Sequence, residues 1–230
     1  MRLLLTRPRS ESEALAAILT ARGHACLIEP MLEIAPTEAE PDLAGVAALI
    51  ATSANGLRAF AARSDRRDLP VIAVGDATAA AARAGGFAKV ESAGGDVMAL
   101  GRHVAATRRP TEGALLHLAG RETAGDLPGA LAGFALRRVV LYEARAATGL
   151  SAALRAALSD LGGALFFSPR SAATFVTLLR SADLSGSVSA MIAFCLSRAV
   201  AEAASPLRWK AVEVAARPDQ AALIDLLPSP

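Results

Sequence analysis

Short apolar runs alternate with longer alanine- and leucine-rich stretches along the entire chain. The longer stretches predict helices, for example over 12–22, 54–62, 77–84 and 151–161. Strands that alternate with helices are typical of βαβ units, in which helices cover both faces of a parallel sheet. Several of the apolar runs are continuous, as in strands that are buried on both faces. The sequence therefore predicts a parallel α/β fold, with strands at Leu3–Thr6, Ala25–Glu29, Ala47–Thr52, Val71–Gly75, Lys89–Ser92, Ala114–Ala119, Arg138–Tyr142, Ala164–Phe167, Ala190–Cys195 and Val212–Ala215.

A weak internal repeat indicates two copies of one βα series. Ser53-Ala54-Asn55 ends one predicted strand, and Phe60 follows on the next helix. Ser168-Pro169-Arg170 ends another strand, and Phe175 follows at the same spacing. Each motif is followed by a second apolar strand that leads into an alanine-rich helix. The alternative is that any two alanine-rich α/β stretches align equally well.

Two copies would divide the chain into two lobes. The second copy is short by one or two strands unless it includes the strands at the N-terminus. We therefore expect a discontinuous lobe of residues 1–33 plus 149–230, with a lobe of residues 37–140 inserted into it. The chain would cross twice between the lobes, at about 33–38 and 141–148, and form a hinge. A cleft between two α/β lobes is a usual place for a ligand.

The composition argues against membrane, secreted and nucleic-acid-binding proteins. The net charge is only +2, and the basic residues form no continuous stripe of the kind that binds nucleic acid. Every apolar run is far shorter than the ~20 residues of a membrane span. Arg7 and Arg9 end the first of these runs, which argues against a signal peptide. The two cysteines, Cys26 and Cys195, form no CxxC motif, so we expect a cytoplasmic protein in a reducing compartment.

Small hydroxyls, glycines and arginines recur where the predicted strands end. These ends are Thr6-Arg7-Pro8, Thr52-Ser53-Ala54-Asn55, Gly75-Asp76-Ala77-Thr78, Ala119-Gly120-Arg121, Ser168-Pro169-Arg170-Ser171 and Leu196-Ser197-Arg198. Ligands of open α/β sheets bind at this edge, where the following helices present free N–H groups. Serine, threonine and asparagine are also ordinary N-caps of helices. Taken together, these ends would form a surface suited to an anionic ligand.

The sequence lacks the motifs of several well-known classes of nucleotide-binding protein and enzyme. There is no GxGxxG motif, no Gly-Lys-Ser/Thr phosphate loop and no GxSxG nucleophile motif. The three histidines do not lie at metal-ligand spacing, so we expect neither a metal nor a cofactor. His117 and Cys195 lie within apolar strands and are predicted to be packed core residues. Tyr142, the only tyrosine, lies at the second crossing, where a packing role is the alternative to a functional one.

Seven short segments of the chain match the motifs of one known family: Leu4–Pro8, Thr52–Asn55, Val74–Ala79, Leu116–Gly120, Leu141–Ala144, Phe166–Ala172 and Cys195–Ser197. Through these segments the chain resembles the uroporphyrinogen-III synthase family. The resemblance covers essentially the whole chain and keeps the order of the motifs. It implies a fold of two flavodoxin/Rossmann-like parallel-sheet lobes joined by a two-stranded hinge, the α/β layout outlined above.

The resemblance implies a lyase of porphyrin and heme biosynthesis that needs no cofactor. Its substrate is hydroxymethylbilane, a linear tetrapyrrole that the family closes to uroporphyrinogen III with loss of water and inversion of ring D through a spiro intermediate. We expect a monomer, with a transient contact to the preceding deaminase and no membrane or nucleic-acid partner. Tyr142 would assist departure of the hydroxyl, and the implied binding residues are Arg7, Ser53, Asn55, Thr78, Ser168 and Ser197.

Ser197 departs from the family pattern, because Leu196-Ser197-Arg198 lacks the Gly-Pro-Thr seen in some members. Two other classes of protein remain open on the sequence. One is a non-catalytic bilobed anion-binding or regulatory sensor domain. The other is a cofactor-dependent Rossmann enzyme, such as a methyltransferase, with a degenerate nucleotide loop; the missing glycine motif argues against it.

Overall fold

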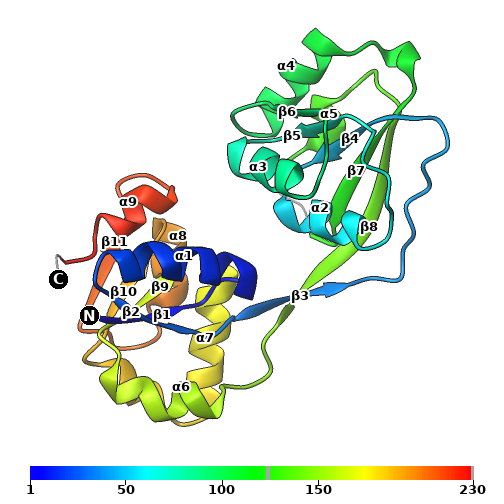
Figure 1. Cartoon of the computed structure of the whole chain (residues 1–230). Helices are drawn as coiled ribbons and strands as arrows, with labels where there is room; N and C mark the ends of the chain where they lie inside the picture. The colour runs from blue at the N-terminus through cyan, green and yellow to red at the C-terminus, as the bar shows by residue number, and fades with distance from the viewer. Residues whose placement is uncertain (123–124, 229–230) are drawn as a thin grey trace. The chain divides into compact units, whose positions relative to one another are not determined.

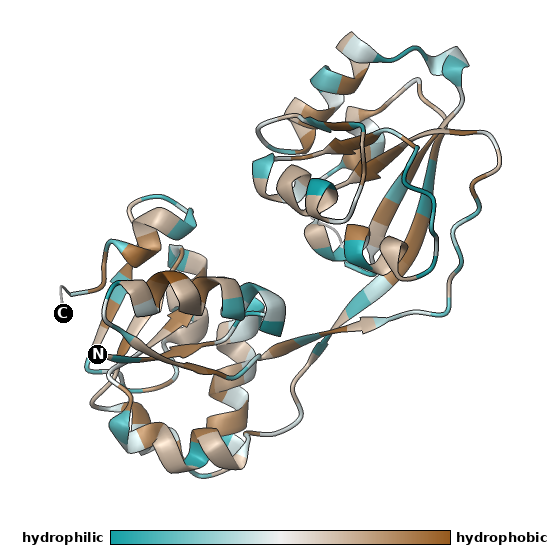
Figure 2. Ribbon diagram, in the orientation of Figure 1, coloured by the Kyte–Doolittle hydropathy of each residue, from teal (hydrophilic) through white to brown (hydrophobic). Residues whose placement is uncertain are grey.

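The computed structural model describes residues 1–122 and 125–228, which form two compact units (Figure 1). The first, called here the discontinuous unit, comprises Met1–Glu33 and Arg145–Pro230. The second, called the inserted unit, comprises Ile34–Ala144. Each unit contains one sheet with helices on both faces, so the predicted α/β fold is confirmed. Hydrophobic residues follow the strands inside each unit (Figure 2).

The described sheet of the discontinuous unit has five strands in the order β11-β10-β9-β1-β2. All its neighbouring strands are parallel. This order corresponds to the flavodoxin-like arrangement of a doubly wound sheet. The strands are β1 (Arg2–Leu5), β2 (Ala25–Ile28), β9 (Gly163–Phe166), β10 (Ile192–Cys195) and β11 (Ala211–Val214). The helices are α1 (Arg9–Ala21), α6 (Ala152–Ala157), α7 (Pro169–Ser181), α8 (Arg198–Ala204) and α9 (Gln220–Ile224), with 3-10 turns at Leu158–Asp160 and Ser185–Val188.

Alternation along β1 divides the core of this unit into two layers. Leu4 faces α6, α7 and α8 and packs in one cluster with Phe166 and Phe175. Its neighbours Leu3 and Leu5 face the opposite side, in a cluster with side chains of α1 and α9. All three leucines have no exposed surface. Burial on both faces explains why the strand is continuously apolar in sequence.

The described sheet of the inserted unit has six strands in the order β3-β8-β7-β4-β5-β6. Helices α2 and α3 pack on one face, with Leu57 and Phe60 in the core, and α4 and α5 pack on the other. The strands are β3 (Leu32–Pro36), β4 (Val46–Ala51), β5 (Val71–Ala73), β6 (Val90–Ser92), β7 (Ala114–Gly120) and β8 (Leu136–Ala146). The helices are α2 (Ala54–Ala61), α3 (Asp76–Ala84), α4 (Val97–Thr107) and α5 (Leu127–Ala130), with a 3-10 turn at Pro110–Glu112.

The two units share one spatial order of strands. Strands β6-β5-β4-β7-β8 of the inserted unit correspond to β11-β10-β9-β1-β2 of the discontinuous unit. In this correspondence, Ser53 after β4 and Ser168 after β9 occupy equivalent places, because each begins a helix that follows the central strand. The first two strands of the chain therefore take the places that β7 and β8 take in the other sheet.

Strands β3 and β8 differ from the predicted elements. The sequence predicted no strand over 32–36 and only a short one over 138–142. In the structure β3 and β8 are neighbours, and they are antiparallel, since Thr37 N donates to Leu141 O (3.1 Å) and Ala147 N donates to Met31 O (3.0 Å). Pro36 is compatible with β3 because that strand lies at the sheet edge, where a residue without an N–H is tolerated. The limits between the units, at 33/34 and 144/145, fall within these two strands.

Candidate functional site

In both sheets several of the candidate residues follow the central strands. Strand β4 of the inserted unit is flanked by β5 and β7, so the order reverses between β4 and β7. Strands β9 and β1 flank the equivalent point of the discontinuous unit. At such a switch point the following helices diverge to opposite faces, and the carboxyl ends of the strands are left open to a ligand. Thr52, Ser53 and Gly120 lie there in one unit, and Thr6, Arg7 and Ser168 in the other.

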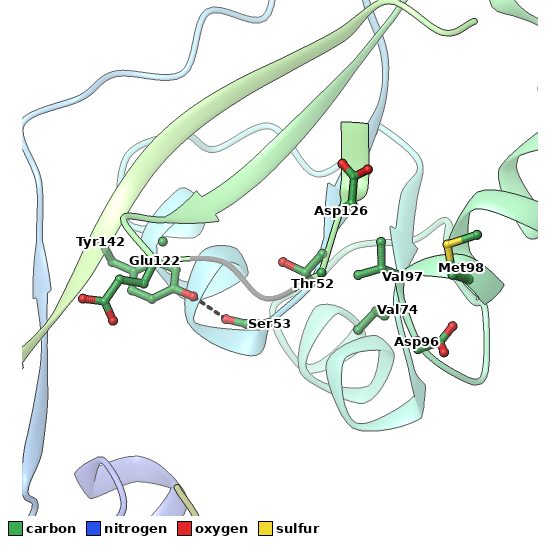
Figure 3. A pocket seen from close by; sticks show the side chains of 11 residues that line it. Thr52, Ser53, Val74, Asp96, Val97, Met98, Glu122, Asp126 and Tyr142 are labelled. Carbon is green, nitrogen blue, oxygen red and sulfur yellow. Dashed lines mark hydrogen bonds between the residues drawn. The ribbon is translucent and has the colours of Figure 1, made fainter. Parts of the chain in front are cut away.

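Ser53 and Tyr142 are joined by a hydrogen bond. Ser53 Oγ and Tyr142 Oη lie 2.8 Å apart (Figure 3). Ser53 is also the N-cap of α2, because its Oγ accepts from the amides of Asn55 (3.1 Å) and Gly56 (3.4 Å). The cap fixes the serine side chain, and the hydrogen bond holds the phenol beside the N-terminus of α2.

Gly120 makes room for the ring of Tyr142. The register between β7 and β8 shifts after the Ala119–Val140 pair, so that Gly120 lies opposite Tyr142. A Cβ at Gly120 would lie only 2.7 Å from Tyr142 Cζ and 2.9 Å from its Oη. Only glycine allows this approach of ring to backbone. The sequence places Gly120 at the end of an apolar strand and within the matching segment Leu116–Gly120, but it predicts no role for this glycine. A glycine at the end of an otherwise apolar strand was the available signal.

A cavity of about 550 Å³ opens beside this pair within the inserted unit. Its walls combine apolar side chains, the hydroxyls of Ser53 and Tyr142, and carboxylates (Figure 3). Asp96 is the N-cap of α4, and the hydrogen bond from the Ala99 amide (2.8 Å) lowers the pKa of its carboxyl group. The described lining residues are Thr52, Ser53, Val74, Asp96, Val97, Met98, Gly120, Glu122, Gly125, Asp126 and Tyr142.

His117 is buried in β7, as predicted, and contacts the same edge of the sheet. Its Nε2 lies 2.9 Å from Thr52 Oγ1, and only 3% of the residue is exposed. Burial, together with the charge of Arg138, lowers the pKa of His117 to about 4. The imidazole is therefore neutral at pH 7, and its hydrogen bond holds Thr52 at the end of β4.

The lowered pKa of His117 makes stability depend on pH. In the unfolded chain His117 binds a proton below a pH of about 6.5, whereas in the folded protein it binds one only near pH 4. The contribution of neutral His117 to the free energy of unfolding is therefore fully present above pH 6.5, and it is lost as the pH drops toward 4. Between pH 7 and pH 5 we expect wild type to lose about 2 kcal/mol more than His117→Gln, which cannot titrate. Urea unfolding followed by circular dichroism measures this difference, and equal losses would contradict it.

Asn55 and Thr78, two predicted binding residues, do not line the cavity. Asn55 Oδ1 accepts from the Arg58 guanidinium (2.9 Å) on the first turns of α2. Thr78 is buried in the first turn of α3. The N-cap of α3 is Gly75, which provides no side-chain acceptor for the amides of that turn. The structure therefore groups Ser53 with Tyr142, while Thr78 lies at a neighbouring helix start.

Arg7, Ser168 and Ser197 lie in the discontinuous unit. The Arg7 guanidinium donates to Glu11 (2.8 Å) and Gln220 (3.0 Å) and stacks over the Phe167 ring, 4.5 Å from its centroid. Ser168 is the N-cap of α7 and accepts from the amide of Ser171 (3.1 Å). Ser197 is the N-cap of α8, but its side chain makes no capping hydrogen bond.

Groups that bind metals are not gathered in the part of the chain that the structure describes. Residues 1–122 and 125–228 contain no cluster of three or more His, Cys, Asp or Glu side chains that could hold a metal ion. Cys26 and Cys195 are free thiols. Cys195 is fully buried, as predicted, and burial raises its pKa to about 11. No helix among the described residues is long and apolar enough to cross a membrane.

Comparison with known proteins identifies the family. The family model for uroporphyrinogen-III synthase HemD matches residues 13–225. The crystal structure of uroporphyrinogen-III synthetase from Helicobacter pylori 26695 superposes with a TM-score of 0.65 at 18% identity, covering 98% of each chain. A mutant uroporphyrinogen III synthase from Thermus thermophilus gives a TM-score of 0.49 at 15% identity, covering 98% of this chain and 96% of that one. No curated protein sequence matches. The chain belongs to the uroporphyrinogen-III synthase family.

Proposed function

We propose that the protein converts hydroxymethylbilane to uroporphyrinogen III, with loss of water and inversion of ring D. The match of the family model over residues 13–225 carries this proposal. The bilane also closes spontaneously, without inversion, to the type I isomer. The protein is therefore expected chiefly to hold the flexible bilane in a conformation that prevents this uninverted closure.

Tyr142 is proposed to donate a proton to the terminal hydroxyl of the bilane. The carbon–oxygen bond then breaks, water leaves with the bonding electrons, and the pyrrole nitrogen supplies electrons to form an azafulvene cation. The substituted carbon of ring D attacks this cation to give the spiro intermediate, which fragments and closes again as the type III product. Loss of a proton at the end of the sequence restores the phenol. The contact of Tyr142 with a cavity supports this role.

The carboxylates of the substrate are proposed to bind at the helix starts that follow the strands. Free backbone N–H groups and the positive end of the helix dipole favour anions at such sites. The proposed side chains are Arg7, Ser168 and Ser197 in the discontinuous unit and Ser53, Asn55 and Thr78 in the inserted unit. Arg7 already contacts Glu11, so its charge toward an anion is partly compensated. The segments at about 33–38 and 141–148 are proposed to act as the hinge.

The product identifies the reaction. Incubation with hydroxymethylbilane, followed by oxidation and separation of the porphyrin isomers, should give the type III isomer. A non-catalytic anion-binding or sensor protein would leave the spontaneous type I product. We further propose a cytoplasmic monomer that contacts the preceding deaminase transiently; the free thiols of both cysteines support a reducing compartment.

Treatment with a chelator should leave the activity unchanged. The described residues offer no cluster of metal-binding side chains, and the proposed proton transfer uses a phenol. We expect the same rate of uroporphyrinogen III formation before and after dialysis against EDTA, without added nucleotide. Loss of activity that zinc restores would overturn this expectation.

A further inference from the structure

The hydrogen bonds around Ser53 favour one direction for its bond with Tyr142, in which either hydroxyl has the geometry to donate. Ser53 Oγ accepts from two amides, those of Asn55 and Gly56. A serine hydroxyl has two acceptor lone pairs and one proton. With both lone pairs occupied, the 2.8 Å bond to Tyr142 Oη uses the proton of Ser53. Tyr142 is then the acceptor in this bond.

We propose that Ser53 and Gly120 are positioning residues that keep the proton of Tyr142 available to a ligand. Since the phenol oxygen accepts from Ser53, its own proton is free to be donated into the cavity that both side chains line. The bond from Ser53 also offsets the negative charge that develops on the phenol oxygen as this proton leaves. This inference rests on the proposed function of Tyr142 as a proton donor.

Gly120 contributes the second constraint on the phenol. The shift in register between β7 and β8 brings Tyr142 opposite Gly120, and the ring lies against the glycine backbone. The ring cannot move closer to the backbone of β7, and its oxygen is held by Ser53, which follows the next strand of the sheet, β4. Contacts at two points thus fix the direction in which the phenol proton is presented.

The inference changes the role predicted for Ser53. As a substrate ligand, Ser53 would affect mainly KM. Its replacement would then raise KM whether or not Tyr142 has a hydroxyl. As a positioning residue, it acts through the hydroxyl of Tyr142 and affects mainly kcat. A double-mutant cycle separates these roles, because residues that act as a unit give non-additive effects.

Raman spectroscopy of the free protein tests the direction of the bond without relying on activity. Tyr142 is the only tyrosine, so the tyrosine Fermi doublet reports on one phenol. The intensity ratio of the doublet is high when the oxygen accepts a hydrogen bond and low when the phenol donates one. We expect Ser53→Ala to lower the ratio and Ser53→Thr to preserve it. A rise, or no change, in Ser53→Ala would overturn the inference even if the enzyme proved active.

Ser151→Ala is the matched control for loss of a capping serine. Ser151 caps α6 by accepting from the Leu154 amide (3.0 Å), and its hydroxyl donates to Glu29 (2.7 Å). It belongs to the discontinuous unit and is not part of the proposed site. The Fermi doublet and kcat should both remain at the wild-type values in this variant.

Kinetics with hydroxymethylbilane complete the test. We expect Ser53→Ala to lower kcat about tenfold at unchanged KM, and Ser53→Thr, which also caps helices, to retain kcat within about twofold. In the Tyr142→Phe background, Ser53→Ala should have no further effect on kcat. A tenfold loss of kcat in both backgrounds, or a change in KM alone, would mean that Ser53 binds the substrate and does not position Tyr142.

Gly120→Ala tests the second constraint. The added methyl group would displace the Tyr142 ring, so we expect a changed Fermi doublet and a kcat near that of Tyr142→Phe. Gly186→Ala is the matched control, because a Cβ at Gly186 meets no atom within 4 Å. A Gly120→Ala protein with the wild-type doublet and kcat would overturn the positioning role of Gly120.

Discussion

Tyr142→Phe should lower kcat by about one to two orders of magnitude while the product remains mostly the type III isomer. The variant keeps the ring against Gly120 and removes the hydroxyl that lies 2.8 Å from Ser53. General acid–base groups typically contribute about 10²–10⁴-fold. The low end is expected because azafulvene formation is intrinsically easy and water can replace the phenol as donor. Steady-state kinetics with hydroxymethylbilane measure this effect.

Two outcomes would assign Tyr142 another role. Full activity of Tyr142→Phe would leave the residue with a packing function. Slow turnover with a shift toward the type I isomer would mean that Tyr142 positions the bilane. Circular dichroism of the variant provides the control, since an unchanged unfolding midpoint shows that the loss of activity does not arise from loss of the fold.

Phe166→Ala should destabilise the discontinuous unit by about 3–5 kcal/mol, as deletion of a buried aromatic ring does. Phe166 is fully buried, and its ring centroid lies 5.5 Å from that of Phe175 and 5.8 Å from that of Trp209. The change leaves a cavity among these rings. Trp209 is the only tryptophan, so its fluorescence during urea unfolding reports on this unit.

Phe167→Ala is the matched control for Phe166→Ala. The neighbouring ring lies on the other face of the sheet, is only partly buried, and carries the Arg7 guanidinium above it. Its removal should lower the free energy of unfolding by clearly less than the removal of Phe166. Equal losses from the two substitutions would contradict the layered core described for this unit.

The strands of the parallel cores could be predicted because burial on both faces leaves a continuous apolar run. Leu3–Leu5 and Leu49–Ala51 are such runs, and none of these residues is exposed. Strand β3 could not be predicted in this way. Its sequence, Leu32-Glu33-Ile34-Ala35-Pro36, mixes polar and apolar residues and ends in proline. An edge strand pairs on one side only, and this pairing depends on β8, which is distant in sequence.

The candidate site was predictable in its residue types and only partly in its geometry. Hydroxyl residues at strand ends marked Ser53 and Ser168, and both are helix N-caps in the structure. The contact between Ser53 and Tyr142 joins residues 89 positions apart. It depends on a shift in register between β7 and β8, which leaves no local pattern in the sequence. The role of Gly120 could not be predicted for the same reason, because its close approach to Tyr142 exists only in the folded sheet.

The isomer composition of the product tests the proposed function most directly. The protein is incubated with hydroxymethylbilane, the product is oxidised to uroporphyrin, and the type I and type III isomers are separated and quantified. Heat-denatured protein provides the control, since it leaves only spontaneous closure. We predict predominantly the type III isomer, formed faster than in the control. Type I isomer alone, formed at the rate of the control, would contradict the assignment of this reaction to the protein.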